Sequence, residues 1–287
     1  MAVVLFDTET GEIDDKEIYS YTTVKQHEAQ LEYAGIKSKN TKFEQYGSFV
    51  WFVYNPLEKI FPELNNSEIA RLIFLSTYID YDTNYLCSSK SNYLKTERIS
   101  KLLHICYKKT QLFLAKLIKL EILEKEDGKY KMNSKIFYKG QIKDNYGADK
   151  ETIRIYIKFI RTLFNTCTPR QHNKLAYFYK LIPYINRKYN VVCSNIFETE
   201  MEYINIMTLE QICDVLDYDK SNISKLIKEL SKIEYGDEYV FCYMAAGDIK
   251  KATIFINPVV FYSGSDNEVI SLLRGFFSKN PTFWQSF

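Results

Sequence analysis

A short segment near residue 220 carries side chains that can read the edges of DNA base pairs. Its polar residues are Lys220, Ser221, Asn222, Ser224, Lys225 and Lys228. An Asn side chain can form paired hydrogen bonds with adenine, and a Lys side chain can reach the acceptors of guanine or a phosphate. Among them lie the apolar residues Ile223, Leu226, Ile227 and Leu230. This spacing predicts a helix with its polar side outward, although a solvated lysine face that binds nothing fits the same pattern.

A second helix and a β-hairpin are needed to present that helix to DNA. Residues 209–216 have the apolar spacing of a short helix, and a polar break separates them from the segment at residue 220. Two β-prone runs follow, residues 239–243 and 252–256. A helix-turn-helix followed by a hairpin is a winged helix, whose second helix enters the major groove. Lys250 and Lys251, in the hairpin loop, are expected to contact a flanking phosphate or the minor groove.

The same pattern occurs a second time, upstream. Residues 99–120 align without a gap with residues 212–233, which are 113 positions later. Three flanking blocks align in the same order, and these are 52–61 with 155–164, 78–88 with 184–194, and 133–140 with 257–264. Four anchor blocks in one order predict a tandem duplication.

The duplication predicts the fold class and the domain boundaries. We expect an α+β, helix-rich chain with two tandem winged-helix domains, residues 49–140 and 152–264, joined by a linker over residues 141–151. A short N-terminal β-hairpin extension, residues 1–48, precedes them. A C-terminal amphipathic helix and aromatic tail, residues 265–287, follow. The downstream copy also has an insertion at 195–207, acidic at Glu198, Glu200 and Glu202, to which the sequence gives no role.

The upstream copy differs from the downstream copy in its chemistry. Between residues 101 and 119 it has five Lys and no acidic residue. Its predicted DNA contacts are Lys108, Lys109, Thr110, Gln111, Lys116, Lys119 and, on the wing, Lys129. Where the downstream copy has Lys225 and Lys228, however, it has Leu112 and Ala115, which would touch thymine methyl groups or pack on another protein. We expect the downstream copy to read sequence and the upstream copy to supply phosphate affinity.

The N-terminal extension offers one enzymatic pattern. Residues 2–6 and 17–22 are expected to pair as a hairpin, and Asp7 and Glu9 lie between them. The Asp7-Thr-Glu9-Thr-Gly11 sequence resembles the first motif of DEDD exonucleases, where two such carboxylates bind a divalent metal that activates water. Those enzymes need further carboxylates on a much longer fold. We therefore favour a solvated acidic turn and expect no enzymatic activity.

Composition narrows the class of protein. The chain has 287 residues with 46% hydrophobic content, enough for two domains with their own cores. Its net charge is only +2, so affinity for nucleic acid must come from local patches. Six Cys without a CxxC pair and three His predict neither a metal site nor a cofactor. With no apolar run of membrane-spanning length and no signal peptide, we expect a cytoplasmic protein.

Several motifs resemble those of known DNA-binding families. Phe255-Ile256-Asn257-Pro258 and the following residues to Glu268, then an apolar helix, resemble the C-terminal end of the winged helix in RepL-type replication proteins of Firmicute plasmids. The Asp7-Thr-Glu-Thr-Gly11 hairpin is similar to the start of those proteins. Residues 169–172 and 181–185 resemble the second unit of phage helix-turn-helix proteins. Two winged helices in tandem also resemble the iteron-binding plasmid replication initiators, whose two units bind successive parts of one site.

The resemblance implies sequence-specific binding of double-stranded DNA, together with origin binding and recruitment of the host replication machinery. We expect a plasmid or phage protein, replication initiator-like, whose two domains read adjacent half-sites as a monomer or a homodimer. A first alternative is a transcription regulator, which would differ in its partner and in the location of its site. A second is a protein-interaction module, an inhibitor or adaptor of a host protein. Its contacts would be Leu112, Ala115, Phe283, Trp284 and Phe287.

Overall fold

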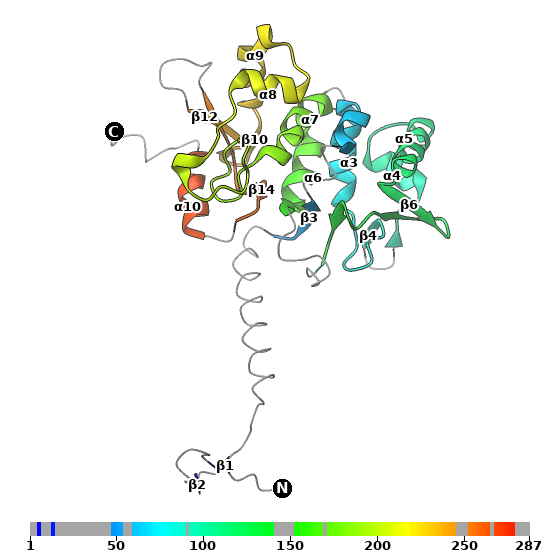
Figure 1. Ribbon diagram of the computed structural model, residues 1–287. Helices are drawn as coiled ribbons and strands as arrows, with labels where there is room; N and C mark the ends of the chain where they lie inside the picture. The colour runs from blue at the N-terminus through cyan, green and yellow to red at the C-terminus, as the bar shows by residue number, and fades with distance from the viewer. Residues whose placement is uncertain are drawn as a thin grey trace. The chain divides into compact units, whose positions relative to one another are not determined.

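The computed structural model describes residues 47–53, 59–89, 92–140, 152–168, 171–244, 252–264 and 267–278, with the strand residues 5–6 and 13–14. Met1–Gln45 and Tyr46–Phe287 are two compact units. In the larger unit, the described residues form a mixed α+β structure of eight α-helices and several small antiparallel sheets (Figure 1). No helix in this part of the chain is long and apolar enough to span a membrane.

In the smaller unit, two short strands pair antiparallel. They are β1 (Leu5–Phe6) and β2 (Ile13–Asp14), with Leu5 opposite Asp14. A hairpin therefore forms where one was predicted, but its return strand begins before residue 17. The expected return strand at 17–22 lies outside the described residues.

A four-stranded antiparallel sheet joins residues 49–140 and 152–264, which are called below the first and the second copy of the predicted repeat. Its order is β14 (Phe261–Tyr262), β9 (Thr152–Tyr156), β3 (Phe49–Val53) and β8 (Phe137–Tyr138). Each copy contributes its first and last strands, and β3 pairs with β9 so that Trp51 lies opposite Arg154. The Trp51 indole donates to Gly140 O at 3.2 Å, and the Arg154 guanidinium donates to Gly264 O at 2.9 Å. The copies therefore share one sheet.

Two helices pack together above this sheet, one from each copy. They are α3 (Asn66–Ser76) and α7 (His172–Lys180), with α6 (Ile157–Thr166) against α3. Asn65 begins α3 through a capping box with Glu68. Ala70 of α3 and Ala176 of α7 occupy equivalent positions in the two copies, and both are buried. Each helix therefore has a small side chain at this position. The pair forms the centre of the unit in Figure 1.

The first copy continues from α3 with a small strand, two helices and a hairpin. The elements are β4 (Cys87–Ser89), β5 (Asn92–Tyr93), α4 (Thr96–Leu102), α5 (Tyr107–Lys119), β6 (Leu123–Glu126) and β7 (Lys129–Met132). Tyr85 bridges to Lys131, which adds the segment before β4 to the hairpin. The turn at Asp127 and Gly128 has positive φ angles of 48° and 75°, as a two-residue Asp-Gly hairpin turn requires.

The second copy has the corresponding helices and a hairpin, but only isolated β-bridges, such as Ile185 with Val192, where the first copy has its small strand. After α7 and the 3-10 turn Ile182–Tyr184 come Met201–Tyr203 in the insertion, α8 (Leu209–Leu216), the 3-10 turn Lys220–Asn222, α9 (Ile223–Leu230), β10 (Glu234–Tyr235), β11 (Glu238–Tyr239), β12 (Phe241–Met244), β13 (Thr253–Ile256) and α10 (Asn267–Gly275). The expected strand at 239–243 begins two residues later. Residues 238–239 pair instead with 234–235 across Gly236, which has a φ of 59°.

One buried hydrogen-bond pattern recurs in both copies. Asn84 Nδ2 donates to Met132 O at 3.2 Å and to Phe137 O at 2.7 Å. Asn190 Nδ2 donates in the same way to Ile256 O at 3.1 Å and Phe261 O at 2.6 Å. Both Asn residues have left-handed backbones, with φ of 60° and 52°. Each fixes the turn after the first helix to the end of the hairpin and to the strand in the shared sheet.

Candidate nucleic-acid interface

Residues 220–230, the predicted DNA-reading segment, have one buried apolar side and one exposed polar side. The apolar residues Ile223, Leu226, Ile227 and Leu230 are all buried. The predicted DNA contacts Lys220, Ser221, Asn222, Ser224, Lys225 and Lys228 are all exposed. The first three of these belong to the 3-10 turn, and α9 itself begins at Ile223. The polar face therefore extends over the turn and the helix, because the buried residues hold both against the core.

Two acidic residues, Asp214 and Asp219, bind the polar side chains at the start of this face. The Asp219 carboxylate accepts from Ser221 N at 2.9 Å and from Asn222 Nδ2 at 3.0 Å. The hydrogen bonds from Ser221 are the main reason that the pKa of Asp219 is lowered. Lys220 is paired with Asp214 at 2.7 Å, and the hydrogen bond to that carboxylate raises the Lys220 pKa. The Asn222 amide nitrogen is therefore engaged within the turn, by Asp219 and by Ser221 Oγ at 3.3 Å, whereas Lys225 lies on the open face of α9.

On α5, the corresponding helix of the first copy, some of the predicted DNA contacts are exposed to solvent and others are not. Lys108, Lys109, Gln111 and Lys119 are exposed. Thr110 is 0% exposed and its hydroxyl donates to Cys106 O at 3.1 Å, so the prediction of a DNA contact there is wrong. Lys116 pairs with Glu68 of α3 at 2.7 Å, so its charge is engaged within the protein. Lys129, on the hairpin, lies 4.4 Å from the ring centroid of Tyr93.

The open face of α5 is apolar where the open face of α9 is polar. Leu112 is 65% exposed and Tyr107 is 50% exposed, and Ala115 and Ile118 are exposed beside them. In the second copy, 113 positions later, Lys220 takes the place of Tyr107 and Lys225 that of Leu112. Lys228 and Ser231 take the places of Ala115 and Ile118. The two helices hold equivalent places but present different chemistry to solvent.

A basic hollow on the first copy was missed by the sequence analysis. It has a volume of about 360 Å³ and is lined by Ser88, Asn92, Tyr93, Lys95, Glu97, Arg98 and Lys101. Glu97 pairs with Lys101 at 3.0 Å. Lys95 is the N-cap of α4, and Arg98 and Lys101 follow at steps of three. This spacing was the available signal, because residues three apart share a helix face. Cations beside hydroxyl and amide groups can bind a phosphate.

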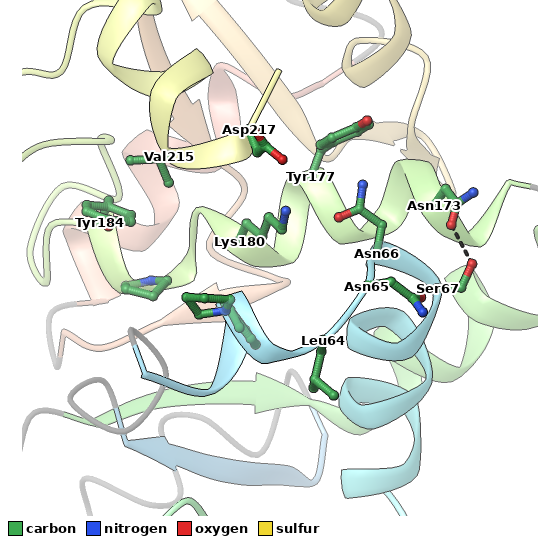
Figure 2. Close-up of a pocket in the computed structure, with 13 residues that line it drawn as sticks. Leu64, Asn65, Asn66, Ser67, Asn173, Tyr177, Lys180, Tyr184, Val215 and Asp217 are labelled. Carbon is green, nitrogen blue, oxygen red and sulfur yellow. Dashed lines mark hydrogen bonds between the residues drawn. The ribbon is translucent and has the colours of Figure 1, made fainter. Parts of the chain in front are cut away.

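A larger hollow lies where α3 and α7 meet (Figure 2). Its volume is about 830 Å³, and it is lined by the start of α3, by Tyr177 and Lys180 of α7, and by Asp217 after α8. Ser67 and Asn173, at equivalent positions of the two copies, hydrogen-bond across it. Burial lowers the Lys180 pKa, which the nearby Asp217 charge opposes. The lining has amides, one Lys and one Asp, but no His or Cys to act as a base or nucleophile.

Some predicted contacts cannot be placed. Lys250, Lys251, Phe283, Trp284 and Phe287 lie outside the described residues, as do Asp7 and Glu9. In the part of the chain that is described, no group of three or more His, Cys, Asp or Glu side chains could hold a metal ion. The six Cys have free thiols.

Comparison of this chain with protein-family models, with curated proteins and with solved structures finds no match. Function is therefore inferred from the side chains of this chain and their geometry. Among them, the exposed face of α9 has the most specific chemistry.

Proposed function

We propose that this chain is a sequence-specific, double-stranded DNA-binding protein with two winged-helix domains in tandem. In the first copy, helix, small strand, two helices and hairpin follow one another as α3 to β7. In the second copy, α7 is followed by α8, α9 and the hairpin of β12 and β13, with isolated β-bridges before α8 in place of the small strand. This order supports the winged-helix proposal. The observation that carries the proposal is the face of α9. Ser224, Lys225 and Lys228 are exposed on the helix that occupies the place of a recognition helix, opposite its buried side.

In this proposal the two copies divide the contacts with DNA. Lys225 and Lys228 of α9 read base edges in the major groove, and Asn222 joins them after exchanging Asp219 for a base. In the first copy, Lys108, Lys109, Lys129 and the hollow with Lys95 and Arg98 bind phosphates. Phosphate contacts set register and affinity but do not discriminate between sequences.

The resemblance to plasmid replication proteins favours a plasmid or phage protein that acts as a replication initiator. A transcription regulator would use the same contacts at a promoter. The genomic position of the preferred site distinguishes the two, because the partner recruited there is replication or transcription machinery.

The experiment that tests DNA reading is selection from a random duplex library followed by sequencing. The purified full chain is expected to enrich one motif, and retesting that motif across a salt series should show binding that weakens with salt. Lys225→Ala with Lys228→Ala should abolish enrichment. Lys158→Ala, at an exposed lysine of α6, is the matched control and should retain the motif. No enriched motif and no salt-dependent binding would contradict the proposal.

The apolar face of α5 favours a second candidate function, protein binding. Leu112 is among the most exposed large apolar residues described, and it occupies the place of a base-reading Lys. Such a surface fits a protein partner better than a phosphate backbone.

A further inference from the structure

Two exposed surfaces of this chain are complementary in charge and in apolar content. The first, the α5 face, consists of Tyr107, Leu112, Ala115 and Ile118 with Lys108 and Lys119. The second is the insertion at 195–207, with Phe197, Met201, Tyr203 and Ile206 among Glu198, Glu200 and Glu202. We propose that the insertion of one copy of this chain docks on the α5 face of a second copy. This contact goes beyond the proposed function, because it requires no DNA.

The insertion is a loop whose backbone is fixed by hydrogen bonds, and it exposes large apolar side chains to solvent. Tyr203 is 63% exposed, and Phe197 and Met201 are each 45% exposed. The backbone beneath them is fixed by side chains. Asn195 Nδ2 donates to Tyr203 O at 2.8 Å, and Asn186 Nδ2 donates to Glu198 O at 2.9 Å. A loop that is already ordered loses little entropy on docking, so its exposed apolar area can contribute to binding.

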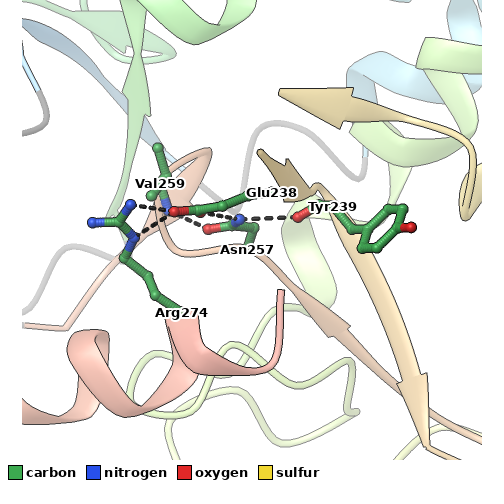
Figure 3. Close-up of polar contacts among 5 residues, drawn as sticks. All are labelled: Glu238, Tyr239, Asn257, Val259 and Arg274. Carbon is green, nitrogen blue, oxygen red and sulfur yellow. Dashed lines mark hydrogen bonds and ion pairs between the residues drawn. The ribbon is translucent and has the colours of Figure 1, made fainter. Parts of the chain in front are cut away.

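A small apolar cluster anchors the insertion on the protein. Ile204 is buried with Val191, Cys193, Phe255 and Phe277. Phe277 follows α10, and α10 is itself fixed by polar contacts (Figure 3). Arg274 of α10 pairs with Glu238, which accepts from Asn257 Nδ2 at 2.8 Å. The insertion therefore projects from a rigid base.

The charges on the two surfaces are opposite. The charged residues beside the exposed apolar side chains are all glutamates in the insertion and all lysines on α5. Docking would bury the apolar residues of both surfaces and bring these charges together at the rim, where pairing selects the partner and the register. The same arrangement does not arise elsewhere in the repeat, because α9 has lysines at the positions of Leu112 and Ala115.

The contact must join different copies. Figure 1 shows α5 at one side of the larger unit and the insertion, in yellow-green beside α10, at the other. One chain therefore cannot place its insertion on its own α5. Because the two surfaces lie at opposite sides of the unit, a pair of copies cannot make both contacts at once, so the contact is heterologous and each added copy leaves one of each surface open for another.

Sedimentation velocity of the full chain without DNA tests this contact. The weight-average sedimentation coefficient is expected to rise steadily with concentration through the micromolar range. Two charge-reversed variants are then compared, one with Glu200→Lys and Glu202→Lys and one with Lys108→Glu and Lys119→Glu. Each should stay monomeric alone, because its insertion and its α5 face then have like charges. An equimolar mixture should associate again, because every facing pair of surfaces is opposite in charge.

Leu112→Ser provides a variant without charge change and should also lower association. It serves in place of a charge-reversed variant that fails to fold, as judged by circular dichroism. Lys225→Ala with Lys228→Ala is the matched control on α9 and should associate like the unchanged protein. The proposal is overturned if the unchanged protein stays monomeric over the whole range, or if the mixture of reversed variants does not associate. Neither outcome bears on DNA binding, which the library selection measures separately.

Discussion

The two copies hold their third helix to their first with the same ion pair in opposite polarity. In the first copy, Glu68 of α3 pairs with Lys116 of α5 at 2.7 Å. In the second, Lys174 of α7 pairs with Glu229 of α9, at positions 106 and 113 residues later. The contact is kept while its charges are exchanged. Internal packing is therefore constrained in both copies, whereas the sign of the charge at each site is free to change.

The outward surfaces differ far more than the interior. The second helix is basic in the first copy, through Lys95, Arg98 and Lys101. The residues 113 positions later are Thr208, Gln211 and Asp214. On the third helix the polarity is reversed, since α5 exposes Leu112 where α9 exposes Lys225. One scaffold therefore carries two surfaces, and we infer that only the second copy reads sequence.

The largest effect is expected from removing the base-reading lysines. Lys225→Ala with Lys228→Ala should lower affinity for the selected site by roughly 100-fold, since each base contact contributes about 1–3 kcal/mol. Affinity for random duplex should fall much less. Fluorescence anisotropy with the two duplexes measures both. An equal loss on both duplexes would show that these lysines bind only phosphate.

Breaking the interior pattern should destabilise the fold. Asn84→Ala removes two buried hydrogen bonds and leaves a left-handed backbone without its Asn, and should cost about 2–4 kcal/mol of unfolding free energy. Asn190→Ala should cost a similar amount, because its bonds are the same. Asn84→Gly is the control, and should recover about 1 kcal/mol by relieving the backbone strain. Urea unfolding measures each, and no loss in either Ala variant would refute the shared role.

Removing the basic hollow should weaken binding without changing preference. Lys95→Ala with Arg98→Ala should lower affinity roughly tenfold for any duplex and reduce the salt slope by about 2, because each of the two cations neutralises one phosphate. Lys158→Ala, at an exposed lysine of α6, should leave both quantities unchanged. An unaltered salt slope in the first variant would remove the hollow from the interface.

The ion pair in the first copy can be converted to the polarity of the second. Lys116→Glu sets two carboxylates against each other and should lower stability by about 1 kcal/mol. Glu68→Lys with Lys116→Glu should restore most of the loss, because the reversed pair is the one that the second copy uses. Thermal unfolding compares the three proteins. A double variant less stable than the single one would show that the two sites are not equivalent.

The smallest effect concerns acid stability. Hydrogen bonds from Lys174 and Lys232 lower the pKa of Glu229 from 4.5 to about 2. A carboxyl group with a lowered folded pKa adds stability above pH 4.5, and this is lost as the pH falls toward 2. Lys174→Ala should therefore flatten the decline in stability between these pH values. Urea unfolding at several acidic pH values measures the slope, and an unchanged slope would contradict the assignment.

The parts of this fold that depend on residues close together in the sequence could be predicted from the sequence. The helix α9 was predicted because its buried residues recur at helical spacing. The shared sheet was not, because the pairing of Trp51 with Arg154 joins strands of different copies. Nor was the role of Asn84, whose acceptors lie 48 and 53 residues away.

Two residues of the candidate site show that the sequence does not reveal contacts between distant elements. Thr110 was assigned to DNA because it lies among exposed residues along the chain, although on the helix it faces the core. Lys116 was counted as a free cation because its partner, Glu68, belongs to a different helix. Local pattern places a residue on a helix, but only the packed fold decides which side is open and which charges are already paired.

The division of roles between the two copies is tested most directly by one ratio, the affinity for the selected duplex over that for random duplex at a single salt concentration. It is measured for the unchanged protein, for Lys225→Ala with Lys228→Ala, and for Lys95→Ala with Arg98→Ala. We expect the ratio to fall toward one only in the α9 variant and to stay unchanged in the α4 variant. An equal fall in both variants would contradict the account, because both copies would then read sequence.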